Sequence, residues 1–203
     1  VVATAPFYAL GGETEVERHF RLLAENTGLE LWANFRPISL TNMLSPDLLI
    51  RLGRDGVIDG VKDSSGDDVA FRWLCRANEA AGHPLQLLTG HEVVVDGAYM
   101  SGADGSVPGL ANVDPEGYVR QWQAYERRDW EAVRTEQDRL AELMRIVQVK
   151  GVQGFGAGVG AFKAALYLLG VFDSPEMPRP VAALEGDNME HVASVLRAVD
   201  LLS

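Results

Sequence analysis

The stretch that decides the fold is Val57-Ile58-Asp59-Gly60-Val61-Lys62-Asp63-Ser64-Ser65-Gly66-Asp67, an apolar run that ends in a lysine and then in small and acidic residues. A short apolar run bounded by turn residues predicts a buried strand, here over Val57–Val61. The next segment, Asp68–Ala81, has a helical period that places Val69 and Trp73 on one side. Together they predict one strand–helix unit of a parallel sheet.

The same alternation of apolar runs and helical periods occurs along the first half of the chain, which predicts five βα units in all. The other predicted strands are Val1–Ala5, Leu29–Ala33, Leu85–Leu88 and Ser106–Val107. The other predicted helices of these units are Glu13–Asn26, a helix capped by Ser45 with Pro46 at its first position, and Glu92–Met100. Only helices are predicted after them: Pro115–Arg127, Trp130–Val149, Gly160–Leu169 and Met189–Leu202.

The composition excludes some classes of partner. The net charge of −11 disfavours nucleic acid and anionic membrane surfaces, because both repel an acidic protein. The most apolar stretch, Val159–Phe172, is too short to span a bilayer and contains Lys163. Cys75 is the single cysteine and is predicted to be a buried thiol. With no basic segment before an apolar one at the N-terminus, we expect a cytoplasmic protein.

Polar residues at the C-terminal ends of parallel strands are the candidates for chemistry. Lys62 is one of only three lysines against fifteen arginines. Neighbouring strands would desolvate its ammonium group, which lowers the pKa and frees the amine to attack a carbonyl carbon and form a Schiff base. Alternatively, Lys62 forms an ion pair with Asp63 or Asp67, and the spacing favours neither interpretation.

Two further strand ends carry groups that could transfer protons. The phenol of Tyr8 could relay a proton, or the ring could simply pack over the sheet. His91 could be a general base or an exposed loop histidine. The histidines have no ligand spacing with Cys75, so a zinc site is not predicted. The glycine-rich run Gly154–Ala161 follows a helix, which favours a connector over a phosphate-binding loop.

The segment Gly60–Asp67 resembles the dihydrodipicolinate synthase and N-acetylneuraminate lyase family, the pyruvate-dependent class I aldolases. Other segments are similar to the family's motifs in the same order: Thr4–Tyr8, Arg18–Phe20, Leu88–Glu92, Gly102–Val107, Ala111–Val113 and Gly160–Leu166. The resemblance covers the chain from residue 1 to about 203. It implies a (β/α)8 TIM barrel with a C-terminal helical extension, of which this chain carries strands 4–8, so that the first three βα units are missing. Residues 1–112 would be the five units and 113–203 the closing helix and helical region.

The chain departs from the family pattern at two site positions. Asn34 stands where the family's Tyr-Asn-Ile-Pro motif has its catalytic tyrosine, and an amide cannot shuttle protons near neutral pH. Ser39 aligns with the arginine by which the synthases hold the carboxylate of their second substrate. That role stays unfilled unless Arg36 takes it.

The resemblance implies a Schiff-base lyase that acts on pyruvate or a longer 2-oxo acid through Lys62. Tyr8 would lie at the mouth of the site, and Gly90 and Val107 would line it. No metal or organic cofactor is implied, and a homotetramer is expected. Two alternatives remain: a dihydrodipicolinate synthase of lysine biosynthesis, or a catalytically impaired member with a ligand-sensing or structural role.

Overall fold

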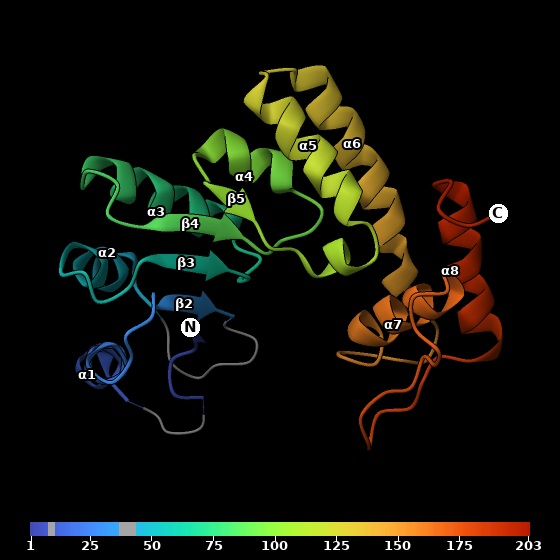
Figure 1. The fold of residues 1–203 in the computed structure, drawn as a ribbon, viewed down its shortest axis with the longest axis horizontal. Coiled ribbons are helices and arrows are strands. Elements are labelled where there is room, and N and C mark those ends of the chain that lie inside the picture. Colours follow the sequence, from blue (N-terminus) through green and yellow to red (C-terminus); the bar gives the residue numbers. More distant parts are fainter. Residues whose placement is uncertain (8–10, 37–43) are drawn as a thin grey trace. The chain divides into compact units, whose positions relative to one another are not determined.

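Five parallel strands pair in the order in which they follow along the chain (Figure 1). They are β1 (Val2–Ala3), β2 (Trp32–Phe35), β3 (Gly60–Asp63), β4 (Gln86–Thr89) and β5 (Gly105–Ser106). This computed structural model describes residues 1–7, 11–36 and 44–203. The chain forms two units, Val1–Pro108, which contains the sheet, and Gly109–Ser203, which is helical. The prediction of a parallel sheet with helices is confirmed.

Two strands, β2 and β3, are displaced most from their predicted positions. β2 and β3 start at Trp32 and Gly60, three residues after the apolar runs begin, and they extend to Phe35 and Asp63. The predicted ends were wrong because each predicted strand stopped before a polar residue, Asn34 or Lys62, that is part of the strand. Side chains of a strand alternate between two faces, and one face of this sheet carries polar residues at the strands' C-terminal ends. Lys62 is therefore inside β3 and not just after it.

The four helices of the first unit are α1 (Glu13–Glu25), α2 (Pro46–Arg54), α3 (Asp68–Ala80) and α4 (Val95–Ser101). With sequential strand order and right-handed crossovers, all four cover the same face of the sheet. Ser45 caps α2, its Oγ accepting a hydrogen bond from the Leu48 amide at 3.2 Å. Pro46 follows at the first helical position, so this predicted start is confirmed.

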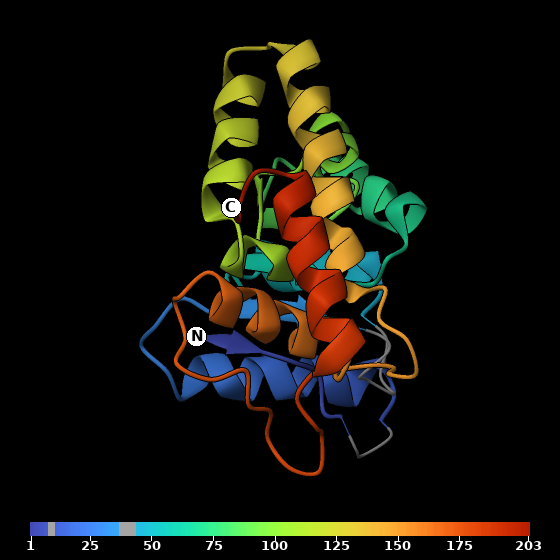
Figure 2. The same cartoon turned by 90° about the vertical axis from the view of Figure 1, so that its right-hand side faces the viewer.

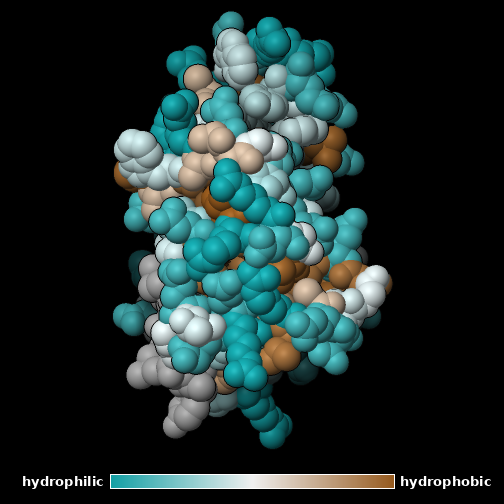
Figure 3. Space-filling view, turned by 90° about the vertical axis from the view of Figure 1, so that its left-hand side faces the viewer, coloured by the Kyte–Doolittle hydropathy of each residue, from teal (hydrophilic) through white to brown (hydrophobic). Residues whose placement is uncertain are grey.

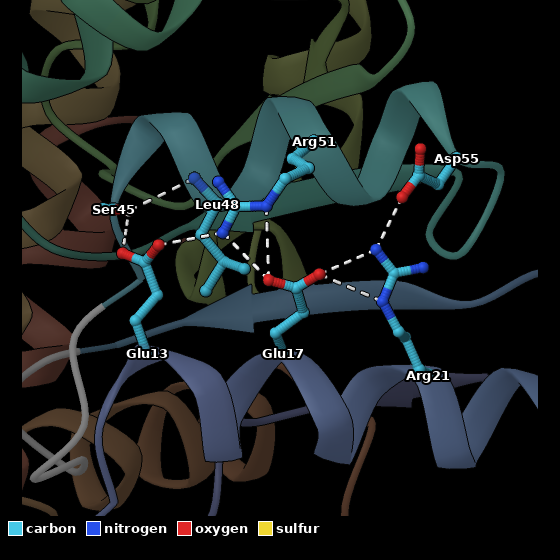
Figure 4. Close-up of polar contacts among 7 residues, drawn as sticks. All are labelled: Glu13, Glu17, Arg21, Ser45, Leu48, Arg51 and Asp55. Atoms are coloured by element: carbon cyan, nitrogen blue, oxygen red, sulfur yellow. Dashed lines mark hydrogen bonds and ion pairs between the residues drawn. The ribbon is translucent and has the colours of Figure 1, made fainter.

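A network of exposed charges joins α1 to α2 (Figure 4). Arg51 Nη2 lies 2.8 Å from Glu13 Oε1 and 2.9 Å from Glu17 Oε2, and Glu17 also pairs with Arg21 at 2.7 Å. Arg21 reaches across to Asp55 at the end of α2, at 2.5 Å. These contacts tie the two helices together along their lengths.

The buried face of α3 differs from the predicted one. Val69 and Trp73 are 69% and 68% exposed, whereas Phe71, Leu74 and Cys75 are buried. Both sets recur every three or four residues, so the period alone did not distinguish them. The buried set includes a polar residue, Asn78, whose Nδ2 donates to the Leu85 carbonyl at 2.7 Å and whose Oδ1 accepts from the Leu85 amide at 3.1 Å. The prediction that Cys75 is buried is confirmed.

The second unit consists of helices only, as predicted for this part of the chain (Figure 2). They are η2 (Gly109–Asn112), α5 (Pro115–Glu126), α6 (Trp130–Leu143), η3 (Met144–Val147), α7 (Gly158–Leu168) and α8 (Gly186–Ala198). The predicted helix Trp130–Val149 is in fact α6 followed by the 3₁₀ turn η3. The buried carboxylate of Asp114 caps α5 and pairs with Arg139 of α6 at 2.6 Å, which links these two helices.

Hydrophilic residues dominate the face in Figure 3, and the hydrophobic ones there form small separate patches. This agrees with the strongly acidic composition. Within the residues that the structure describes, no helix has both the length and the apolarity needed to cross a membrane.

Candidate active site

Lys62 projects from β3 on the face of the sheet opposite the helices. Its neighbours in the strand, Val61 and Asp63, are buried on the helical face, and the Asp63 charge acts on Cys75 of α3. Because side chains alternate along a strand, Lys62 takes the other face, where its side chain is half-buried. The strand therefore holds the lysine with core residues on both sides of it.

Strand pairing places two residues beside Lys62. Asn34 of β2 and Leu88 of β4 are its register partners. Neighbouring strands lie about 4.8 Å apart, so these side chains lie next to the lysine on the same face. The Asn34 side-chain oxygen is buried and has no hydrogen-bond donor among the described residues. The site therefore pairs an amine with a buried, unsatisfied amide acceptor.

The Lys62 side chain occupies space that is open because residue 90 is a glycine. A Cβ atom at this position would lie 2.7 Å from Lys62 Cε and would overlap Ser64 Oγ. The Gly90 amide donates to the Asp63 carbonyl at 2.6 Å, which fixes the end of β4 against the end of β3. A side chain at position 90 would therefore require Ser64 Oγ and Lys62 Cε to move, and Lys62 leans towards β4.

Burial is the main electrostatic influence on Lys62. It lowers the pKa of the ammonium group because the charged form loses solvation. The negative charge of Glu92 opposes this and raises the pKa, while the positive charge of Arg36 lowers it further. The neutral, nucleophilic amine is thus more populated than in a free lysine.

The alternative in which Lys62 pairs with Asp63 or Asp67 is not what the structure shows. Asp63 Oδ1 accepts from the Ser65 amide at 2.6 Å, and Asp67 Oδ1 caps α3 by accepting from the Ala70 amide at 2.9 Å. Burial raises the pKa of Asp63. In the described parts of the chain, both carboxylates hold the loop after β3 and do not neutralise the lysine.

The other predicted site residues divide into three groups. Arg36 and Gly90 lie at the ends of β2 and β4, beside Lys62. Val107 follows β5, where it is exposed and its amide donates to the Thr89 carbonyl at 2.8 Å. Tyr8 and Ser39 lie outside the described residues.

The prediction missed Glu92, the acidic residue whose charge acts most on Lys62. Its signal was its position two residues after Gly90 at a strand end. His91 was considered there instead, but its Nδ1 lies 3.1 Å from Asp68 Oδ1 at the start of α3. A carboxylate near the amine is the better candidate for moving a proton at this site.

A separate hollow of about 720 Å³ lies between α3 and α4. It is lined by Val69, Trp73, Arg76 and Val94, among others, and so lies on the helical side of the sheet. Lys62 points to the other side. The hollow and the reactive lysine therefore lie on opposite sides of the sheet. We take the face with Lys62 as the candidate site because it carries the nucleophile.

Comparisons with a family model and with curated proteins point to one and the same family. A model of the dihydrodipicolinate synthetase family matches residues 1–199. A protein named as an uncharacterized DapA-like lyase of Halobacterium salinarum is 32% identical over 203 residues, which are 100% of this chain and 62% of that protein. A 4-hydroxy-tetrahydrodipicolinate synthase of Kineococcus radiotolerans is 27% identical, over 92% of this chain and 60% of that protein.

A solved structure supports the same relationship. The dihydrodipicolinate synthase of Bacteroides thetaiotaomicron is similar with a TM-score of 0.88 and 26% identity, and the match covers 97% of this chain and 65% of that one. The chain thus spans about three fifths of the curated relatives, 62% and 60% of their lengths.

Proposed function

The chain belongs to the dihydrodipicolinate synthetase family, and on that premise we propose that it is a Schiff-base-forming lyase whose nucleophile is Lys62. The substrate would be pyruvate or a longer 2-oxo acid. The observation that carries the proposal is a half-buried lysine whose pKa is lowered by burial, packed against a glycine where an added methyl group would displace the lysine side chain.

We propose in addition that the five strands correspond to strands 4–8 of a (β/α)8 barrel. Residues 1–112 would then be the C-terminal five βα units, and 113–203 the closing helix and helical extension. The partial coverage of the relatives and the sequential parallel strand order support this assignment. The uncovered face with Lys62 would be the inside of the barrel.

The proposed chemistry needs an uncharged amine. Lys62 Nζ attacks the C2 carbonyl carbon of the 2-oxo acid, and the carbonyl oxygen leaves as water to give a protonated imine. The imine withdraws electrons, so C3 can lose a proton to give an enamine, which adds to the carbonyl carbon of an aldehyde. The reverse sequence breaks the same carbon–carbon bond. Neither direction needs a metal or an organic cofactor.

The neighbouring residues would bind and orient the substrate. Asn34 would hydrogen-bond the bound molecule, and Gly90 and the backbone near Val107 would line the pocket. Arg36 carries the positive charge that a substrate carboxylate needs, and Ser39 would border it. Tyr8 would act at the mouth of the site.

Borohydride trapping tests the proposal. Reduction in the presence of pyruvate should add the reduced adduct to Lys62, as read by peptide mass mapping, and Lys62→Arg should abolish it. Lys163→Arg is the matched control, because Lys163 Nζ donates to the Glu176 carbonyl at 2.8 Å and lies outside the site. An adduct elsewhere, or none in a folded protein, would overturn the assignment.

Asn34 favours a second candidate, a family member that senses a 2-oxo acid without turning it over. An amide cannot replace a phenol in proton transfer. A thermal shift with pyruvate, without product from any aldehyde partner, would support this alternative. Synthesis of 4-hydroxy-tetrahydrodipicolinate, the activity named for the Kineococcus relative, is less favoured because Ser39 stands at the family's arginine position.

We propose that the protein assembles as a homotetramer. The exposed Trp130, whose ring contacts Tyr125 at 5.9 Å between centroids, is the kind of aromatic surface that interfaces use. Leu143, the last residue of the same helix, is buried and does not contribute to that surface. Light scattering on the intact protein decides the matter, and a monodisperse monomer at micromolar concentration would rule the tetramer out.

A further inference from the structure

The hydroxyl group of Ser64 lies beside the Lys62 side chain. A Cβ atom built on Gly90 would lie 2.7 Å from Lys62 Cε and would overlap Ser64 Oγ. Two atoms that crowd the same point are close neighbours, and Lys62 Nζ is one bond beyond Cε. The hydroxyl is therefore within reach of the atoms that the amine attacks, once a bound molecule draws these groups together.

The backbone around Ser64 is fixed by three hydrogen bonds. The Ser64 amide donates to the Phe35 carbonyl at 2.8 Å, which ties this position to the end of β2. The Gly90 amide donates to the Asp63 carbonyl at 2.6 Å, which ties the preceding residue to the end of β4. The buried Asp63 carboxylate accepts from the Ser65 amide at 2.6 Å. A group held in place in this way loses little freedom when it takes part in a reaction.

The register partners of Lys62 on the neighbouring strands do not relay protons. Leu88 has no polar atom, and the amide of Asn34 does not titrate near neutral pH. Addition of an amine to a ketone nevertheless requires a proton transfer, because the nitrogen gains a positive charge and the oxygen a negative one. A hydroxyl both donates and accepts, so it can give away its own proton while it takes another.

We propose that Ser64 is a catalytic residue of this site and that its hydroxyl relays a proton from Lys62 Nζ to the ketone oxygen when the amine adds to a 2-oxo acid. The inference rests on the proposed Schiff-base function of Lys62. Attack forms the bond between Nζ and C2, and the carbonyl electron pair moves to the oxygen. Ser64 Oγ accepts the proton that Nζ releases and gives its own to that oxygen. The product is a neutral carbinolamine, and the hydroxyl is restored.

Rates of imine formation test the relay. The intact protein is mixed with saturating pyruvate, the reaction is stopped with borohydride after different times, and the adduct on Lys62 is counted by mass. Ser64→Ala should lower the rate constant by about 100-fold or more, the usual effect of a positioned proton-transfer group. The final amount of adduct should stay at the wild-type level, because a group that ends the step unchanged alters the rate and not the equilibrium.

Two further variants isolate the hydroxyl from the shape of the side chain. Ser64→Thr keeps a hydroxyl and should restore most of the rate, whereas Ser64→Val has nearly the same shape without the hydroxyl and should not. This pair gives the same comparison if Ser64→Ala does not fold. Ser65→Ala is the matched control, because Ser65 Oγ accepts from the Asp67 amide at 3.1 Å in the turn before α3. It should react at the wild-type rate.

The pH dependence of the rate distinguishes a relay from an effect on the amine itself. A hydroxyl carries no charge, so Ser64→Ala should leave the midpoint of the profile, which the pKa of Lys62 sets, where it is in the wild type. A shifted midpoint would mean that Ser64 acts on the protonation of Lys62, and it would overturn the relay.

The remaining outcomes separate the relay from the Schiff-base function. A smaller fall in rate, or one that Ser64→Thr does not restore, overturns the relay while the Schiff-base function stands. An unchanged rate constant with a higher half-saturating pyruvate concentration also overturns it, because Ser64 would then only hold the substrate. No adduct in folded wild type overturns the Schiff-base function, and the relay falls with it.

Discussion

Asn34 and Lys62 lie side by side in register on β2 and β3, on the sheet face opposite helices α1 to α4. One of the two side chains titrates and the other does not. The protonation state of this face is therefore governed by Lys62 and by the two charged residues that act on it, Glu92 and Arg36.

The pKa of Lys62 should respond to these two charges in opposite directions. Glu92→Gln removes a negative charge that raises the pKa, so the pKa should fall further below that of a free lysine. Arg36→Met removes a positive charge that lowers it, so the pKa should rise. NMR titration of the lysines after reductive ¹³C-methylation measures both shifts without any substrate.

The assignment is simple because the chain has only three lysines, and Lys62→Arg removes one signal. The signal of Lys163, in the second unit, serves as the internal reference in both variants. Shifts of the same sign in the two variants would contradict the described electrostatics.

Gly90→Ala should disturb Lys62 directly. The added methyl would lie 2.7 Å from Lys62 Cε, so the lysine must move, and overpacking of this kind costs about 1–3 kcal/mol. We expect the yield of the trapped pyruvate adduct to fall at least about 10-fold, because small displacements of reacting groups slow a reaction by such factors. Gly97→Ala in α4 is the control: nothing lies within 4 Å of its added methyl. It should leave trapping intact and stabilise the helix by about 0.5–1 kcal/mol.

Asn78→Ala should be among the most damaging changes in the first unit. The substitution leaves the buried backbone amide and carbonyl of Leu85 without their hydrogen-bond partner, which in the wild type is the Asn78 side chain. Two unsatisfied buried groups correspond to roughly 2–5 kcal/mol, to be measured by urea unfolding. Asn78→Asp keeps the acceptor but loses the donor and buries a charge, so it should not rescue stability. A loss below about 1 kcal/mol would mean that water replaces the amide.

Arg51→Ala should weaken the link between α1 and α2 in a salt- and acid-dependent manner. The ion pairs are exposed, so the fall in melting temperature should shrink in high salt. Hydrogen bonds from Arg51 hold the pKa values of Glu13 and Glu17 below their usual range in the folded state. Their contribution is thus present above the unfolded pKa and is lost as the pH falls through the folded one.

Thermal melts of Arg51→Ala and wild type should accordingly differ at neutral pH and converge below about pH 4. Arg54→Ala, an exposed arginine of the same helix that takes no part in the network, is the control. A difference that persists in acid would show that Arg51 acts through packing of its aliphatic stem.

The sequence predicted the parallel sheet and its helices because apolar runs and helix caps are local signals. It also made Lys62 a candidate nucleophile because lysines are rare in this chain, and that role stays a prediction. It did not predict where β2 and β3 end, since polar residues on the uncovered face look like loop residues. It also chose the wrong face of α3. Asn78 belongs to the buried face because it satisfies the backbone of Leu85, a contact that no helical period reveals.

The sequence also did not reveal the electrostatic effect of Glu92 on Lys62. Its effect on Lys62 depends on how the loop after β4 folds back beside β3, and Gly90 controls this through its bond to the Asp63 carbonyl. The sequence shows the glycine and the glutamate only as neighbours in a strand-end motif. Asp63 and Asp67 accept hydrogen bonds from the Ser65 and Ala70 amides, contacts that the sequence did not reveal either.

The alternation of faces also has an evolutionary consequence. In β2, β3 and β4 the even-numbered positions, such as Asn34, Lys62 and Leu88, share the uncovered face, and the odd-numbered ones, such as Val61 and Leu87, build the core. Alternate residues of the same three strands thus determine ligand binding and core packing. Substitutions at positions such as 34 and 88 can change the ligand-facing side chains without replacing a core residue, whereas an insertion or deletion of one residue within a strand exchanges the two sets and loses both at once.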